Sequence, residues 1–73
     1  MKITIEYCTA WNYKPRASSL EEELRSEFGA DVDVELIPGS GGVYVVCVDG
    51  RQIFSKKEVN RFPDEGEILA LLK

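Results

Sequence analysis

Alternating apolar and polar residues open the chain and predict a β-strand over residues 2–7. Its odd-numbered residues, Ile3, Ile5 and Tyr7, are apolar, and the residues between them are polar. This period of two is typical of a strand with one buried face. Residues 32–37 repeat the alternation before a proline, so they predict a second strand of the same kind.

The segment between these two strands has the period of a helix. Its apolar residues recur at helical spacing on one face: Ala17, Leu20, Leu24 and Phe28. Ser18 and Ser19 each stand three residues before a glutamate, which is a capping-box pattern, although Pro15 is compatible with an earlier start. Gly29 supplies a stop, so a helix is predicted over residues 17–28. A helix between two strands favours a βαβ unit with parallel strands.

The second half of the chain predicts a hairpin and a closing helix. The run 43–48 is apolar throughout, as expected of a central strand covered on both faces. Asp49-Gly50 is a strong hairpin turn into a return strand over 51–56, and a last helix is expected over 63–72. The order β-α-β-β-β-α predicts one thioredoxin-like α/β (α+β) domain over residues 1–73. Its four-stranded mixed sheet would have the first strand inside, with two helices packed on it.

Composition narrows the classes of function. The net charge of −4 argues against nucleic acid as a partner, because phosphate binding needs a basic surface. No apolar run approaches the roughly 20 residues of a membrane helix, and the start lacks the pattern of a signal peptide. We therefore expect no membrane partner and a cytoplasmic protein. The chain has no histidine and two cysteines, which removes Cys–His dyads and leaves no credible zinc set or bound cofactor.

Cys8 is the only serious catalytic candidate. It stands at the end of the first apolar run, before a short loop that leads into the predicted helix. The thiolate is the reactive form of cysteine, and a helix N-terminus and nearby cations such as Lys14 and Arg16 would stabilise it. We therefore expect the pKa of Cys8 to lie below the reference of about 8.5. The alternative is a leftover cysteine, partly buried and inert.

Three further patterns extend along most of the chain. The first is Tyr7-Cys8-Thr9-Ala10 together with Tyr13-Lys14-Pro15-Arg16, and the second is Pro38-Gly39-Ser40-Gly41-Gly42-Val43-Tyr44. The third consists of Val48-Asp49-Gly50, Ile53-Phe54-Ser55-Lys56-Lys57 and Arg61-Phe62-Pro63. In order and spacing they resemble the redox loop, glycine loop and hairpin of the selenoprotein W-like family, also called Rdx. The family pattern is Cys-x-x-Cys or Cys-x-x-selenocysteine. Cys8 matches the first position, and Trp11 occupies the second. The resemblance implies a thioredoxin-like fold and thiol redox chemistry, without an intramolecular Cys-x-x-Cys disulfide.

Two functions from different classes remain open. The first is a redox protein with a single nucleophilic thiol, Cys8, which would form a mixed disulfide with glutathione or a partner protein. The second is a non-catalytic binding module that keeps the family surface without its chemistry. In that module Trp11, Tyr13 and the 39–42 loop would form a docking patch.

The other candidate site residues each have a functional and a structural interpretation. Trp11 could cover Cys8 or stack on a partner, or it could cap the edge of a small core, and Tyr13 is similar. Lys14 and Arg16 could lower the thiol pKa or bind the carboxylates of glutathione, or they could be solvated cations.

Gly41 and Gly42 belong to a turn whose backbone should pass close to the Cys8 loop. Cys47 is expected to be a small buried hydrophobe in its strand. It should also lie beyond the ~7 Å Cα limit for a disulfide with Cys8.

Overall fold

The computed structural model describes residues 1–64 and 66–72 of the chain. In chain order these residues form β1 (Lys2–Cys8), α1 (Lys14–Phe28), the 3₁₀ turn η1 (Gly29–Asp31), β2 (Asp33–Gly39), β3 (Tyr44–Val48), β4 (Arg51–Ser55), α2 (Lys56–Val59) and α3 (Glu67–Leu72). The predicted order is confirmed, with η1 and α2 as two short additions.

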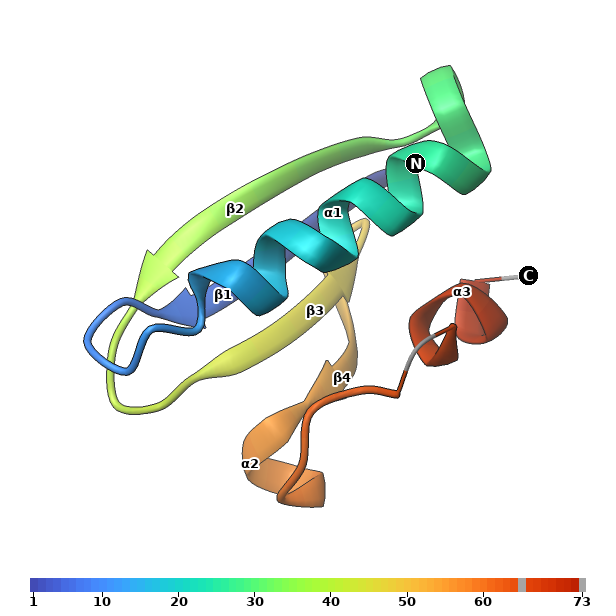
Figure 1. Ribbon diagram of the computed structural model, residues 1–73. Helices are drawn as coiled ribbons and strands as arrows, with labels where there is room; N and C mark the ends of the chain where they lie inside the picture. The colour runs from blue at the N-terminus through green and yellow to red at the C-terminus, as the bar shows by residue number, and fades with distance from the viewer. Residues whose placement is uncertain (65, 73) are drawn as a thin grey trace.

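The four strands form one mixed sheet in the order β2-β1-β3-β4. β1 runs parallel to β2 and antiparallel to β3, and β3 pairs with β4 in an antiparallel hairpin. The first strand therefore lies inside the sheet, with α1 running across it (Figure 1). The predicted thioredoxin-like α+β architecture is confirmed.

The core lies on one face of this sheet. Ile3 and Ile5 of β1 expose none of their surface, whereas Glu6 between Ile5 and Tyr7 is exposed. The buried residues of the sheet share one cluster with Leu24 of α1 and Ile68 of α3. The two helices therefore cover the same face of the sheet. The apolar residues that alternate in the sequence are the ones that face these helices.

The other face of β3 is more open than predicted. Val46 is fully buried, but Val45 and Cys47 on the opposite side of the strand are only half-buried. The prediction that residues 43–48 are covered on both faces is wrong, because α1 and α3 pack on the same side. The prediction that Cys47 is a buried core residue is wrong for the same reason.

Helix α1 begins three residues before its predicted start. Its N-cap is Tyr13, whose side chain makes no capping hydrogen bond, and Pro15 lies in the first turn. Proline suits that position because its fixed φ is helical and its missing N–H would have no partner there. The capping-box residues Ser18 and Ser19 therefore lie inside the helix, and Ala17 is fully buried.

Strand β2 continues through Pro38 to Gly39, two residues further than the sequence indicates. β2 is an edge strand, and Pro38 pairs with Tyr7 of β1 on the inner side. A proline is tolerated in an edge strand when its nitrogen faces away from the neighbouring strand. The missing N–H then removes no hydrogen bond from the sheet. This extension brings Gly39 opposite Cys8.

The C-terminal region differs most from prediction. β4 ends at Ser55, and Lys56 begins α2, a single turn that ends at Asn60 in a left-handed conformation. The last helix begins at Glu67 rather than at 63. Position 65, which the predicted helix includes, lies outside the described residues.

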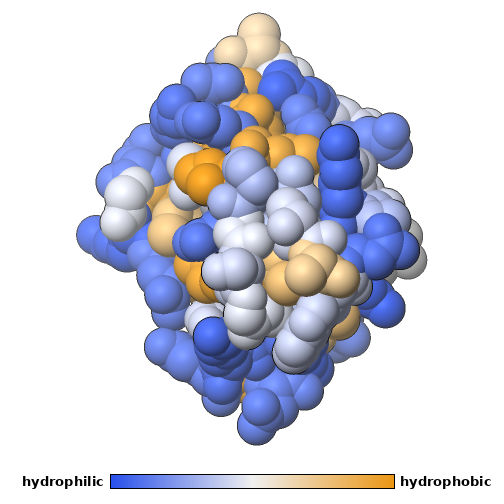
Figure 2. Space-filling view, turned by 90° about the vertical axis from the view of Figure 1, so that its left-hand side faces the viewer, coloured by the Kyte–Doolittle hydropathy of each residue, from blue (hydrophilic) through white to orange (hydrophobic). Residues whose placement is uncertain are grey.

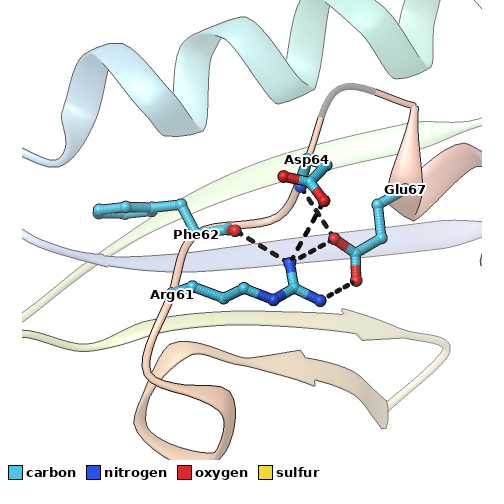
Figure 3. Close-up of polar contacts among 4 residues, drawn as sticks. All are labelled: Arg61, Phe62, Asp64 and Glu67. Carbon is cyan, nitrogen blue, oxygen red and sulfur yellow. Dashed lines mark hydrogen bonds and ion pairs between the residues drawn. The ribbon is translucent and has the colours of Figure 1, made fainter.

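A polar network fixes the connection between α2 and α3 (Figure 3). Arg61 donates to both carboxylate oxygens of Glu67, at 2.7 and 2.9 Å, and to the carbonyl of Phe62 at 3.2 Å. The backbone N–H of Asp64 donates to the same carboxylate at 2.8 Å. The Arg61 hydrogen bond, followed by that of Asp64, lowers the pKa of Glu67 to about 2. The network holds the backbone around Phe62, whose ring reaches the candidate site.

No helix within residues 1–64 and 66–72 is both long enough and apolar enough to cross a membrane.

Candidate functional site

Cys8 occupies the last position of β1, where three chain segments meet at one end of the sheet (Figure 1). Its backbone N–H donates to the carbonyl of Val43 at 2.8 Å, and its carbonyl accepts the N–H of Tyr13 at 3.3 Å. The N–H of Thr9 donates to the carbonyl of Gly39 at 3.2 Å. These bonds hold the β1–α1 loop, residues 9–13, against the β2–β3 loop, and Cys8 exposes none of its surface.

Trp11 lies directly against Gly42 of the β2–β3 loop. A Cβ atom built on Gly42 would stand 2.5 Å from Cζ3 and 2.9 Å from Cε3 of the indole. Gly42 also has a φ of 76°, a left-handed conformation that disfavours other residues. The glycine turn therefore approaches the Cys8 loop closely, as predicted, and the contact is between the indole of Trp11 and the Cα of Gly42. Trp11 nevertheless remains 61% exposed.

Backbone amides of the two loops act on the pKa of the Cys8 thiol. Burial is the largest effect on the thiol and raises its pKa, but hydrogen bonds from the N–H groups of Gly42, Trp11 and Ala10 lower it, as does the charge of Lys57. The net effect is that the pKa of Cys8 lies below its ordinary value. Donors aimed at the sulfur favour the thiolate, which is the nucleophilic form.

The cation that acts on the thiol differs from those predicted. Lys57 of α2 approaches the β2–β3 loop, and a Cβ atom on Gly41 would stand 3.7 Å from its Nζ. Lys14 is exposed at the start of α1, and neither it nor Arg16 contributes to the lowered pKa of Cys8. The direction of the expected shift agrees with the structure, but its sources are loop amides and α2.

Tyr13 and Arg16 join an aromatic cluster instead. The Tyr13 ring makes edge contacts with Trp11 at 6.1 Å and with Phe62 at 4.8 Å between centroids. The guanidinium of Arg16 lies over Phe62, 4.1 Å from the ring centre, and Nζ of Lys56 lies 5.3 Å from that centre. Phe62 therefore connects α1, α2 and the Cys8 loop.

The end of the molecule that carries these loops is shown in Figure 2. Residues of intermediate hydropathy occupy the middle of this face, hydrophobic residues lie beside them, and hydrophilic residues lie mostly toward the margin.

A groove of about 460 Å³ lies beside the cluster, between α1 and the segment leading to α3. Its lining includes Pro15, Leu20, Phe62 and Pro63, with Tyr44 among them. The Tyr44 hydroxyl donates to the carbonyl of Arg16 at 3.4 Å, and burial raises its pKa to about 12. Cys8 does not line the groove, so the thiol and this groove are separate features.

Cys8 has no second sulfur in reach. Cys47 pairs with Thr4, four residues from Cys8 along β1, which corresponds to roughly 13 Å. Both cysteines are free. Within residues 1–64 and 66–72, no three side chains of the His, Cys, Asp and Glu types are grouped so that they could hold a metal ion.

Sequence reasoning missed the residues that α2 and its following segment bring to the site. Lys56, Lys57 and Phe62 lie about 50 residues from Cys8 in the chain. The available signal was the Lys56-Lys57 pair directly after a strand, which stands out in an acidic chain. Its position beside Cys8 depends on the helical turn after β4, which the hydrophobic pattern does not indicate.

Comparison with known proteins places this geometry in a family. The Rdx family profile matches residues 2–73. The chain is 33% identical to selenoprotein W of Mus musculus over 66 residues, which cover 88% of this chain and 75% of the mouse protein. It is also 33% identical to selenoprotein W of Ovis aries over 73 residues, covering 96% of this chain and 84% of the sheep protein.

Two crystal structures share the fold. A protein from Bordetella parapertussis superposes with a TM-score of 0.93 at 33% identity, covering 97% of this chain and 91% of that one. A selenoprotein W-related protein from Vibrio cholerae superposes with a TM-score of 0.85 at 28% identity, covering 99% and 96%. Sequence and structure agree over nearly the whole length, and the chain therefore belongs to the redox-related Rdx family together with the selenoprotein W proteins.

Proposed function

We propose that this protein is a monothiol redox protein in which Cys8 is the nucleophile. The supporting observation is that three backbone N–H groups and Lys57 favour the thiolate of Cys8 despite its burial. Amide donors and a nearby cation are typical of reactive cysteines, which are also partly exposed, whereas Cys8 is fully buried. The compartment that suits this chemistry is the cytoplasm, where glutathione keeps thiols reduced.

The absence of a cysteine at position 11 determines the form of the reaction. The Cys8 thiolate attacks one sulfur of oxidised glutathione, a Cys8–glutathione disulfide forms, and one glutathione thiolate leaves. A second glutathione thiolate then attacks the glutathione sulfur of the mixed disulfide. This step releases the Cys8 thiolate and regenerates oxidised glutathione. An oxidised partner protein can take the place of oxidised glutathione in the first step.

Exchange also requires that the Cys8 loop opens. A disulfide must approach the attacking sulfur directly, and Cys8 has no exposed surface. Two backbone hydrogen bonds join this loop to its surroundings, from Thr9 to Gly39 and from Tyr13 to Cys8. Residues 9–12 are exposed, so an outward movement of this segment would uncover the thiol at little packing cost.

Incubation with oxidised glutathione tests the proposal. We expect one glutathione adduct at Cys8 in the wild type and in Cys47→Ser, and none at this position in Cys8→Ser. Intact mass and peptide mapping locate the adduct, and added reduced glutathione should remove it. An unmodified Cys8, under conditions that modify an ordinary exposed thiol, would sink the proposal.

A docking function is the second candidate, and the exposure of Trp11 favours it. A tryptophan that is 61% exposed beside a glycine turn is the kind of anchor that concentrates binding energy in interfaces. We expect a docking partner to be retained by Cys8→Ser under reducing conditions and lost with Trp11→Ala. A pull-down with both variants distinguishes the candidates, since a partner that depends on Cys8 and is released by reductant indicates redox chemistry instead.

A further inference from the structure

Ion pairing separates the cations of this protein into two groups. Lys2, Arg25 and Arg61 each contact a carboxylate within 4.0 Å. Within residues 1–64 and 66–72, the other Lys and Arg side chains make no ion pair. They are Lys14, Arg16, Arg51, Lys56 and Lys57. All of them except Arg51 come from α1 or α2, the helices beside the Cys8 end of the sheet.

Three of these unpaired cations, Arg16, Lys56 and Lys57, are positioned by the candidate site. We call them the basic rim. Arg16 lies over the Phe62 ring, 4.1 Å from its centre, and Nζ of Lys56 lies 5.3 Å from the same centre and 5.8 Å from that of Tyr13. The third, Lys57, stands over the glycine turn and acts on the Cys8 thiol. Contacts with ring faces position cations while leaving their donors available.

The rim has a charge opposite to that of the chain as a whole. The net charge is −4, yet the charged group that acts on the Cys8 thiol is a cation, Lys57, which makes no ion pair with the described residues. Unpaired cations that converge on one place attract anions and raise their local concentration. Lys and Arg donors bind carboxylates through charge-assisted hydrogen bonds.

We propose that the basic rim is a carboxylate-binding subsite that selects anionic disulfides and thiols for exchange at Cys8. This inference rests on the proposed function and adds a substrate class to it. A carboxylate on the incoming disulfide would contact Lys56 and Lys57 while its near sulfur bonds to Cys8. The disulfide bond then breaks, and the leaving thiolate carries its own carboxylate away. The sequence-based expectation gave this role to Lys14 and Arg16, whereas the geometry gives most of it to α2.

Two pairs of probes test the rim separately from the exchange reaction. Iodoacetate and iodoacetamide are nearly equal in size and differ in charge, so the ratio of their rates at Cys8 reports the local field and cancels the thiolate fraction. Dithiodipropionate and hydroxyethyl disulfide form the corresponding anionic and neutral pair for exchange. All rates are measured at Cys8 in a Cys47→Ser background.

We expect the double variant Lys56→Gln/Lys57→Gln to reduce both ratios, the rate with the anionic probe divided by the rate with the neutral one, by roughly three- to tenfold. This is the effect expected of removing two partly screened charges. Raising the salt concentration should reduce the wild-type ratios in the same direction. Arg51→Gln is the matched control, because it removes one unpaired cation at the opposite end of β4 from Lys56. Circular dichroism confirms that each variant is folded.

The proposal that the basic rim binds carboxylates would be overturned by equal rate ratios in the wild type and the double variant. It would also be overturned if the ratios fell equally in Arg51→Gln. If the iodoacetate ratio behaves as expected but neither disulfide reacts, the rim is retained as an anion subsite and the proposed exchange reaction fails. If both disulfides react at rates that do not depend on charge or on Lys56 and Lys57, exchange is retained and the rim fails. A Cys8 that no probe modifies overturns both.

Discussion

Replacing Gly42 with alanine is expected to destabilise the protein and to raise the pKa of Cys8. The φ of 76° at this position costs a non-glycine residue about 1–3 kcal/mol. The new Cβ would also stand 2.5 Å from Cζ3 of Trp11, so the indole must move. Because the Gly42 N–H is one of the donors that lower the pKa of Cys8, a displaced turn weakens that hydrogen bond. Urea unfolding measures the stability, and the pH dependence of iodoacetamide alkylation measures the pKa.

Gly50→Ala is the matched control for this variant. Gly50 has a φ of 84° in the β3–β4 hairpin, and no atom would lie within 4 Å of its added Cβ. It therefore carries the backbone penalty alone and should leave the alkylation midpoint of Cys8 unchanged. The midpoint of the wild type should lie below the reference of about 8.5, and that of Gly42→Ala should lie above the wild-type value. Equal midpoints in the two glycine variants would show that the turn does not act on the thiol.

Replacing Trp11 with alanine is expected to accelerate modification of Cys8 roughly tenfold or more. Cys8 is fully buried at the base of its loop, and the indole of Trp11 holds that loop against Gly42. Removing a contact that favours the closed loop by about 1.4 kcal/mol would raise the open population tenfold. The free energy of unfolding should fall by a similar amount, about 1.4 kcal/mol, because the contact is absent in the unfolded chain as well as in the open loop. Alkylation rates of Cys8, followed by peptide mapping, provide the measurement.

Cys47 is an internal control for this experiment. It lies half-buried on the open face of the sheet, opposite Thr4, which is four residues before Cys8 in β1. Its rate should not differ between the wild type and Trp11→Ala, and Trp11→Phe should give an intermediate rate at Cys8. A uniform rise at both cysteines would indicate general loosening of the fold, and an unchanged rate at Cys8 would contradict a role for Trp11 as its cover.

The two variants act on one contact from opposite sides, so their combination is informative. If the indole and the glycine turn are coupled, the steric part of the Gly42→Ala penalty should disappear in the Trp11→Ala background, and only the backbone strain should remain. Non-additivity of this kind is the expected sign of direct contact. In a Cys-x-x-Cys pattern that begins at Cys8, position 11 would be the second cysteine, and here Trp11 stands there against Gly42.

The strands and the main helix could be predicted from local pattern. The alternation in residues 2–7 is repeated in the burial of β1, since Ile3 and Ile5 face the core and Glu6 does not. The apolar run 43–48 has no alternation. Its pattern therefore could not show that no helix covers the side of the strand on which Val45 and Cys47 lie. Which face a helix covers depends on chain connectivity, and local periodicity carries no information about it.

The sequence by itself determined the thiol, its place at the end of a strand, and the absence of a second cysteine at position 11. It also indicated the direction of the shift in the pKa of Cys8. Only the tertiary structure decided which groups cause that shift, because hydrogen bonds and Coulomb interactions depend on distance in space. The turn after β4 brings Lys57 to the thiol, while Arg16, eight residues from Cys8 in the chain, lies over Phe62. Nearness in sequence therefore misled where a long-range contact determines the chemistry.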